Sequence, residues 1–397
     1  MKTLLFYCRH ILGIGHLMRS MAIAHGLMQD FQVYFVNGGE SIQEFPIPQG
    51  INVINLPVVK PGVDMGRPQV GECSPETSPT LVRRRDVLIE LCDRIHPDAV
   101  MLESFPFDHH QFAAELIPLL EWAKAHGAKT ICSLRDSVVT SQGRAKYEAR
   151  VCQLINQYFD QLLIHSDPRF IALEHSFSLV GKLTCDIHYT GYIVPDIDRE
   201  FPPKKTSDPP MILVSVGGGR FGHQLLDCVA KASQYLEDKI PHQIHMFTGP
   251  FVPIGVYDNL QKMAVCCSNL TVERYTPDLL SYMAKAHLSI SLTSYDTTLN
   301  VLQTGVRAMQ LPLRGHPDHE QRLRCNRLEE LGIVKVIEPA DLQPILFSLE
   351  ILDTLSRDLN RIYFCLRGVQ ITAARVKALV TQEDFFTPLT RIVKPFS

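Results

Sequence analysis

The chain has 397 residues; at about 150 residues per domain this predicts two to three domains, because one hydrophobic core rarely grows beyond about 250–300 residues. Hydrophobic residues make up 45% and charged residues 20%, which excludes a disordered or fibrous chain. Lys and Arg total 39 against 42 Asp and Glu, a formal charge of -3, so no overall field would attract nucleic acid or an anionic membrane.

The 11 cysteines are scattered and form no C-x-x-C pair, a pattern that neither a disulfide framework nor a structural zinc site requires. We interpret them as reduced thiols of a cytoplasmic protein. The apolar run in MKTLLFYCRH is too short for a signal peptide, and no segment reaches the roughly 20 apolar residues of a membrane helix. The sequence predicts no nucleic-acid partner and no transmembrane segment; it leaves peripheral membrane contact and the oligomeric state open.

Short apolar runs alternate with amphipathic stretches in the first half of the chain. The apolar runs are TLLFYC, QVYFVN, INVINL, DAVMLES and KTICSL, and the helix-like stretches include SMAIAHGLMQ, LVRRRDVLIELCDRI and FAAELIPLLEWAKAHG. This alternation is typical of βαβ units with a parallel sheet. Arg83, Arg84 and Arg85 open one amphipathic helix and are expected to be solvated, with a grip on an anionic acceptor as the alternative.

Five prolines between positions 194 and 210 predict an interdomain linker. The alternation then restarts with MILVSV and continues through HQIHMFTG, LTVERY and HLSISL to VKVIE, and the stretch from about Leu349 to Leu379 is expected to be helical. The predicted organisation is a domain over 1–194, a linker over 195–210, a domain over 211–375 and a tail over 376–397 that returns to the first domain. The fold class is α/β, with two doubly wound Rossmann-like domains facing a central cleft.

The first predicted strand leads into a loop, residues 9–19, that contains Gly13 and Gly15. Ligands of open α/β sheets bind at the carboxyl ends of strands, where loops meet helix N-termini. Two glycines allow a tight turn that places His16 and Arg19 at the start of the following helix, facing the cleft. His16 is a candidate base for an acceptor hydroxyl; a capping or packing histidine is the alternative.

A second glycine-rich loop, Gly217-Gly218-Gly219-Arg220-Phe221-Gly222, follows MILVSV and fits the G-x-G-x-x-G dinucleotide pattern. That pattern also requires an acidic residue after the next strand, yet HQIHMFTG ends in Gly249-Pro250. NAD is therefore disfavoured, and a diphosphate cradle of backbone amides is favoured. Glycines that only permit close packing of strand and helix are the alternative.

A third constellation, residues 294–300, follows HLSISL and opens a helix that ends near Gly305. Its hydroxyls and amides suit a phosphate. Further along, the carboxylate of Glu320 and the amide of Gln321 suit the hydroxyls of a hexose. Each group alone is more often a helix cap or a solvated face, so the prediction depends on their order and spacing.

These loops together resemble the GT-B superfamily of glycosyltransferases, in particular predicted bacterial glycosyltransferases similar to the N-acetylglucosaminyltransferase of lipid II synthesis. The resemblance covers most of the chain. It rests on GIGHLMRSMAIAHGL, SLRD at 133–136, VSVGGG, SYDTTLNVLQTG and HEQRLRCNRLEELGIVKVI, the last being the most specific block.

The resemblance implies a hexosyltransferase that takes a nucleoside diphosphate sugar, expected to be UDP-linked, in its C-terminal domain and inverts the anomeric carbon. It implies no metal and no other cofactor, with His16 as the base and Arg19 as the second catalytic residue. The implied acceptor-side residues are Gly13, Gly15, Arg135 and Asp136. The implied donor-binding residues are Gly217, Gly218, Gly219, Arg220, Arg274, Tyr275, Thr276, Tyr295, Asp296, Thr297, Thr298, Asn300, Glu320 and Gln321.

At position 300 the family usually has a glutamate that holds the ribose hydroxyls, whereas this chain has Asn300, so the identity of the nucleotide stays open. The motif G-x-G-H-x-M-R also resembles the sugar-nucleotide hydrolases of the pseudaminic acid pathway, which use the histidine with water. A hydrolase and a non-catalytic GT-B homologue therefore remain as alternatives.

Three other features carry weaker hypotheses. Asp196-Ile197-Asp198 looks like a D-x-D metal motif but falls in the predicted linker. His109 and His110, like residues 316–319, lack the H-E-x-x-H spacing or cysteine partner of a zinc site and are expected to be surface or loop histidines. Residues 60–79 are rich in turn formers and are expected to form a lip over the cleft that orders on acceptor binding.

Overall fold

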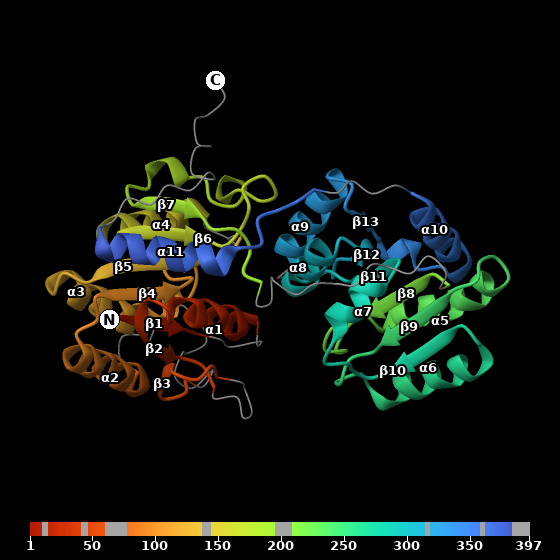
Figure 1. Cartoon of the computed structure of the whole chain (residues 1–397), viewed down its shortest axis with the longest axis horizontal. Helices are drawn as coiled ribbons and strands as arrows, with labels where there is room; N and C mark the ends of the chain where they lie inside the picture. Colours follow the sequence, from red (N-terminus) through yellow and green to blue (C-terminus); the bar gives the residue numbers. More distant parts are fainter. Residues whose placement is uncertain are drawn as a thin grey trace, which may run out of the picture. The chain divides into compact units, whose positions relative to one another are not determined.

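The computed structural model divides into two compact units, Met1–Pro195 with Cys365–Ser397, and Asp196–Phe364, each built on its own parallel sheet (Figure 1). The structure describes residues 1–9, 15–40, 47–59, 78–136, 144–194, 209–313, 318–357 and 362–382. Several predicted features lie outside the described residues: Gly13, the lip up to residue 77, the linker with its D-x-D motif up to residue 208, and the histidine at 316.

The first unit contains a seven-stranded parallel sheet in the order β3-β2-β1-β4-β5-β6-β7. Its strands are β1 (Lys2–Cys8), β2 (Phe31–Asn37), β3 (Asn52–Asn55), β4 (Ala99–Glu103), β5 (Lys129–Leu134), β6 (Gln161–Ile164) and β7 (Asp186–Tyr189). The strand order changes direction between the neighbours β1 and β4, where Tyr7 pairs with Leu102. Parallel sheets bind ligands at the carboxyl edge of such a switch point.

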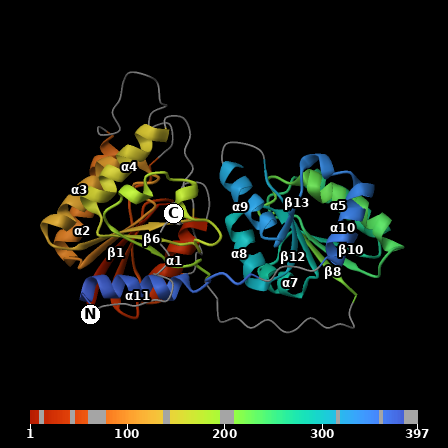
Figure 2. The same cartoon turned by 90° about the horizontal axis from the view of Figure 1, so that it is seen from above.

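Helices cover both faces of this sheet (Figure 2). One face carries α1 (Gly15–Leu27) and α11 (Gly368–Thr381), and the other carries α2 (Pro79–Ile95), α3 (Ala113–Ala125) and α4 (Arg144–Tyr158). Along β1, Leu5 and Tyr7 pack into the core under α2 and α3, while Leu4 and Phe6 pack into the core under α1. A strand buried on both faces needs a continuous apolar run, which explains why TLLFYC shows no alternation.

The predicted domain boundary at residue 375 is wrong, because the chain returns to the first unit at Cys365. There Tyr192 N–H donates to the Cys365 carbonyl at 2.7 Å, and Gly368 N–H donates to the Tyr192 carbonyl at 3.0 Å. A Cβ at Gly368 would lie 2.5 Å from the Gly191 carbonyl oxygen, so the return requires glycine there. The predicted helical stretch from Leu349 is accordingly two helices, α10 (Pro344–Ser356) and α11.

Arg84 corrects the expectation that all three arginines of α2 are solvated, because its side chain is fully buried. Residue 84 falls on the same helix face as Leu81 and Leu88, which pack on the sheet. Its Nε and Nη2 donate to the Glu115 carboxylate at 2.6 and 2.9 Å, and its Nη1 donates to the carbonyls of Gly38 and Pro57. Arg84 therefore ties α2 and α3 to loops at the carboxyl edge of the sheet.

The second unit contains a six-stranded parallel sheet in the order β10-β9-β8-β11-β12-β13. Its strands are β8 (Met211–Ser215), β9 (Gln243–Phe247), β10 (Leu270–Glu273), β11 (Leu288–Leu292), β12 (Arg307–Leu311) and β13 (Val334–Val336). Figure 2 shows α5 (His223–Glu237) and α10 on one face, with α7 (Leu279–Lys285), α8 (Tyr295–Thr304) and α9 (Asp318–Glu330) on the other; α6 (Ile254–Cys266) packs beside α5. Two parallel sheets covered on both faces confirm the predicted α/β class.

Candidate functional site

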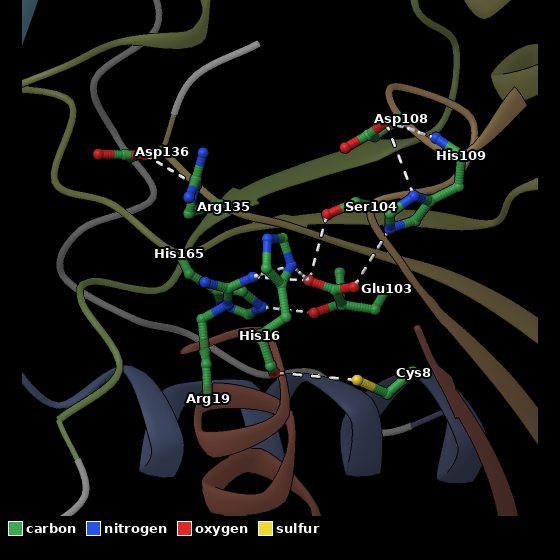
Figure 3. A network of polar contacts seen from close by, with 11 residues as sticks. Cys8, His16, Arg19, Glu103, Ser104, Asp108, His109, Arg135, Asp136 and His165 are labelled. Carbon is green, nitrogen blue, oxygen red and sulfur yellow. Dashed lines mark hydrogen bonds and ion pairs between the residues drawn. The ribbon is translucent and has the colours of Figure 1, made fainter. Parts of the chain in front are cut away.

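A buried carboxylate lies at the carboxyl edge of the first sheet. Glu103 is the last residue of β4 and is 1% exposed. His16 and Arg19 lie in the first turn of α1, at the helix start that the glycine-rich loop predicted. There His16 Nδ1 lies 2.6 Å from Glu103 Oε1, and Arg19 Nη2 donates to the same oxygen at 2.6 Å (Figure 3). Since His16 and Arg19 are three residues apart on one helix, their side chains share a face.

The surroundings of Glu103 keep it ionised. Burial alone would raise the pKa of its carboxyl, but the imidazoles of His109 and His16 and the charge of Arg19 outweigh burial and hold that pKa well below its ordinary value. An ionised carboxylate only accepts hydrogen bonds, so Nδ1 of His16 carries the proton in this contact. In the neutral imidazole the lone pair then belongs to Nε2, and the side chain is 32% exposed.

A second imidazole faces the other oxygen of the same carboxylate. His109 Nε2 lies 3.7 Å from Glu103 Oε2, and the rings of His109 and His16 are 6.3 Å apart. Ser104 and His109 bracket the loop after β4 with left-handed backbone angles, φ 61° and 64°, and Asp108 Oδ1 accepts the His109 N–H at 2.6 Å (Figure 3). His109 is in a loop, as expected of a surface or loop histidine, but its side chain is buried.

The neighbouring strands contribute further polar groups to this edge. His165 follows β6, with Nε2 2.7 Å from Ser133 Oγ on β5 and Nδ1 2.9 Å from Thr190 Oγ1. Burial, and to a lesser degree the charge of Arg19, lowers the pKa of His165 to about 3, so this imidazole is neutral. The predicted acceptor-side pair follows β5, where Arg135 Nε lies 3.6 Å from the buried Asp136 Oδ1.

In the second unit, the glycine-rich loop joins β8 to α5 and packs backbone against backbone. Gly219 has φ 83°, and a Cβ there would lie 2.4 Å from the Thr248 carbonyl oxygen. Gly249 is equally tight, because its Cβ would lie 2.4 Å from the carbonyl carbon of Gly218. At Gly218 itself a Cβ would meet only the Phe251 ring, at 3.5 Å. Packing therefore explains Gly219 and Gly249 but leaves Gly218 without a steric reason.

The predicted donor-binding residues Arg274, Tyr275 and Thr276 lie next to this loop. Gly249 N–H donates to the Arg274 carbonyl at 2.8 Å, which joins the turn after β10 to the glycine loop. The Arg274 guanidinium stacks over Tyr257 at 4.1 Å, and that of Arg220 over Phe251 at 4.7 Å. Thr276 Oγ1 accepts the Asp278 N–H, and Tyr275 is 64% exposed.

The N-terminus of α8 has a cap from its own chain. Ser294 Oγ accepts the Thr297 N–H at 3.1 Å and donates to Thr297 Oγ1 at 2.8 Å, which is the helix-cap alternative considered for this segment. Tyr295 lies under Arg324, Asp296 is exposed, and Thr298 is buried. Asn300 is half-buried in the second turn of this helix.

A pocket of about 410 Å³ lies within the second unit, lined by residues 220–225 and 311–313 with Pro339 and Leu342. The predicted residue Arg220 lines this pocket, and Gln321 contacts one of its lining residues, because the N–H of Leu313 donates to Gln321 Oε1 at 3.3 Å. The side chain of Glu320 lies outside the part of the chain that the structure describes.

The sequence predicts neither a metal site nor a membrane-spanning helix, and two findings on the described residues bear on these expectations. Among these residues no group of three or more His, Cys, Asp and Glu side chains is arranged to hold a metal ion. Within the same ranges, no helix is long and apolar enough to cross a membrane.

No protein-family model matches the chain, and no curated protein matches its sequence. Solved structures do match: MurG of Acinetobacter baumannii is 16% identical over 96% of this chain and 99% of that chain, with a TM-score of 0.61. The calicheamicin glycosyltransferase CalG4 is 14% identical over 99% and 100%, with a TM-score of 0.60. UGT2 of Phytolacca americana, complexed with UDP-2fluoro-glucose and pterostilbene, is 10% identical over 96% and 94%, with a TM-score of 0.59. These likenesses confirm that the chain has the predicted GT-B fold of two Rossmann-like domains.

Sequence reasoning missed Glu103, His109 and His165 as members of one network. Each lies at or shortly after the carboxyl end of a buried strand, as in AVMLE and QLLI, and that position is the signal that could have found them.

Proposed function

We propose that the chain is an inverting glycosyltransferase that moves a sugar from a nucleoside diphosphate sugar to an acceptor hydroxyl without a metal ion. The observation that carries the proposal is the 2.6 Å contact between His16 Nδ1 and the buried carboxylate of Glu103. A carboxylate on Nδ1 fixes the tautomer, so that Nε2 is the atom that accepts a proton.

The step is a single displacement at the anomeric carbon. His16 Nε2 takes the acceptor's hydroxyl proton as that oxygen forms the new bond to the anomeric carbon. On the opposite face, the bond to the diphosphate oxygen breaks and its electron pair leaves with the nucleoside diphosphate. The imidazolium formed on His16 is stabilised by Glu103, and a positioned base of this kind contributes about 10²–10⁴-fold to the rate.

The second unit is the proposed donor domain. The glycine loop presents Gly217 and Gly218 on the surface, and backbone amides of such loops suit a diphosphate. The UDP-2fluoro-glucose in the Phytolacca americana structure supports a UDP-linked sugar as the first donor to test. The fourteen predicted donor residues, Asn300 included, remain proposals for this domain.

The test replaces His16 by Ala and measures two quantities without added metal: UDP release from UDP-sugars with a panel of hydroxyl acceptors, and calorimetric UDP binding. We expect release to fall by about 10²–10⁴-fold while the dissociation constant for UDP stays the same. His25→Ala, at the exposed last turn of the same helix, is the matched control and keeps full activity.

Other outcomes separate the alternatives. UDP release that needs His16 but proceeds equally with water alone would favour the sugar-nucleotide hydrolase. Nucleotide binding without turnover in the unaltered chain would favour the non-catalytic homologue. Full turnover in the His16→Ala variant would overturn the proposed base.

A further inference from the structure

Arg9 is a buried cation directly after β1, at the same edge of the sheet as Glu103. Its side chain is 3% exposed, and its guanidinium carbon lies 3.3 Å from the centre of the Phe112 ring. Phe112 is fully buried in the core between the sheet and α3. One face of the guanidinium is thus covered by an aromatic ring. Its N–H groups can therefore find partners only in the plane of the guanidinium itself.

Those partners are missing within the described part of the chain, where Nε and Nη1 of Arg9 are buried without a hydrogen bond. The two carboxylates whose charges act on Arg9 are engaged elsewhere. Glu115 accepts from Arg84 and, at 2.5 Å, from the Tyr7 hydroxyl. Asp108 is 66% exposed, and its Oδ1 accepts the His109 N–H.

The charge of Arg9 is therefore unbalanced among its neighbours. The buried pairs Arg84–Glu115 and Arg19–Glu103 are each neutral overall. Burial lowers the pKa of Arg9 to about 10, which still leaves the guanidinium protonated at neutral pH. Burying a charge without a counter-charge costs folding free energy, so an arginine kept in this state indicates an anionic ligand.

A chain of ring contacts joins Arg9 to the proposed base. The Phe112 ring that it covers is 6.4 Å from the ring of His109, which is 6.3 Å from that of His16. We propose that Arg9 binds an anionic oxygen group of the acceptor, a phosphate or a carboxylate. This inference rests on the proposed function, since it makes the acceptor an anionic molecule whose hydroxyl is presented to His16.

The experiment titrates the full chain with methyl phosphate and with acetate, each with and without saturating UDP, and compares wild type with Arg9→Met. Methionine keeps the apolar stem over Phe112 and removes the charge. We expect one of the two anions to bind the wild type and to bind Arg9→Met at least about tenfold more weakly. The stronger probe identifies the phosphate or the carboxylate as the acceptor group.

Stability supplies the second readout. Replacing an unpaired buried charge by an apolar residue of similar volume is neutral or stabilising. Arg9→Met is therefore expected to unfold at the same temperature as wild type or higher, whereas a merely structural arginine would make the variant less stable. Arg94→Met, which removes an exposed arginine from the last turn of α2, is the control for loss of charge and leaves anion binding unchanged.

Two results would overturn the inference: no anion binding by the wild type, or equal anion binding by the wild type and Arg9→Met. If UDP also abolishes the anion binding that Arg9→Met leaves unchanged, the anion binds in the second unit. If Arg9→Met does not fold, the role of Arg9 is structural and the inference fails. The UDP titration of the same proteins is independent, so a failure of the donor proposal is read separately from a failure at Arg9.

Discussion

The carboxyl edges of the two sheets differ in which atoms form them, polar side chains in the first sheet and backbone atoms in the second. At the edge of the first sheet, side chains carry the polar chemistry: a carboxylate, two arginines and three imidazoles lie at the ends of β1, β4 and β6 and in the first turn of α1. At the edge of the second sheet, the glycine loop and its neighbour at Gly249 approach through backbone atoms, with Cβ positions that would clash at 2.4 Å. One edge is organised by charge and the other by the absence of side chains.

Because of this difference, the two edges should be sensitive to different substitutions and conditions. An edge organised by buried charges responds to removal of one member of a pair and to pH. An edge organised by backbone contact responds to the addition of one methyl group. The same GT-B fold thus carries two kinds of strand edge, and three experiments can separate them.

The largest effect is expected at Arg84, which contrasts with Arg9 on the same edge. Arg84→Met removes one half of the buried pair with Glu115 and leaves that carboxylate without its counter-charge. We expect the free energy of unfolding to fall by about 3–5 kcal/mol. Chemical denaturation measures it, with Arg85→Met as the control that changes stability by less than about 1 kcal/mol. Equal stability of the Arg84 and Arg9 variants would contradict the distinction between a paired and an unpaired cation.

The second effect is a pH dependence of the first unit. His165 stays neutral in the folded chain because its pKa is about 3, whereas the unfolded histidine takes up a proton below about pH 6.5. The unfolded state therefore binds more protons at low pH than the folded state does. This proton uptake stabilises the unfolded state and lowers the free energy of unfolding by about 2 kcal/mol from pH 7 to pH 5. The stability contributed by the neutral imidazole is complete above about pH 6.5 and is lost as the pH falls.

Denaturation at pH 5, 6 and 7 checks this expectation. His165→Gln should flatten the slope of unfolding free energy against pH by about 1.4 kcal/mol per unit below pH 6, whereas His25→Gln, an exposed histidine of α1, should leave the slope as it is. A slope that His165→Gln leaves unaltered would show that the buried imidazole titrates normally.

The two edges were also unequally predictable from the sequence. The alternation of apolar runs and amphipathic stretches predicted both sheets, since strands buried on two faces are continuously apolar. Tight glycine turns predicted His16 and Arg19 at the start of a helix. The partner Glu103 is 87 residues from His16, and only the pairing of β1 with β4 brings them together. Sequence spacing does not contain strand order, so the network escaped prediction.

Two corrections have equally physical reasons. Arg84 is in the middle of three arginines, yet the helical period places it with Leu81 and Leu88 on the buried face, and a run of like residues hides that period. The return of the chain at Cys365 depends on backbone contacts of Gly191 and Gly368. Such contacts cannot be recognised from the composition of the segment, so the boundary was predicted too late in the chain.

The smallest effect is the sharpest test of the backbone-built edge. Gly218 does not have a left-handed φ, and its Cβ would make only an ordinary contact with Phe251, so Gly218→Ala should unfold within about 1 kcal/mol of wild type. A methyl group on an exposed loop that approaches a diphosphate should nevertheless weaken UDP binding about tenfold, equal to about 1.4 kcal/mol, as measured by calorimetry. Gly219→Ala is the opposite case, since φ 83° and the Thr248 carbonyl make it destabilising before any ligand is added. If Gly218→Ala binds UDP like the wild type, the three glycines serve packing alone, and the diphosphate must meet another part of the second unit, with the N-terminus of α8 the next segment to alter.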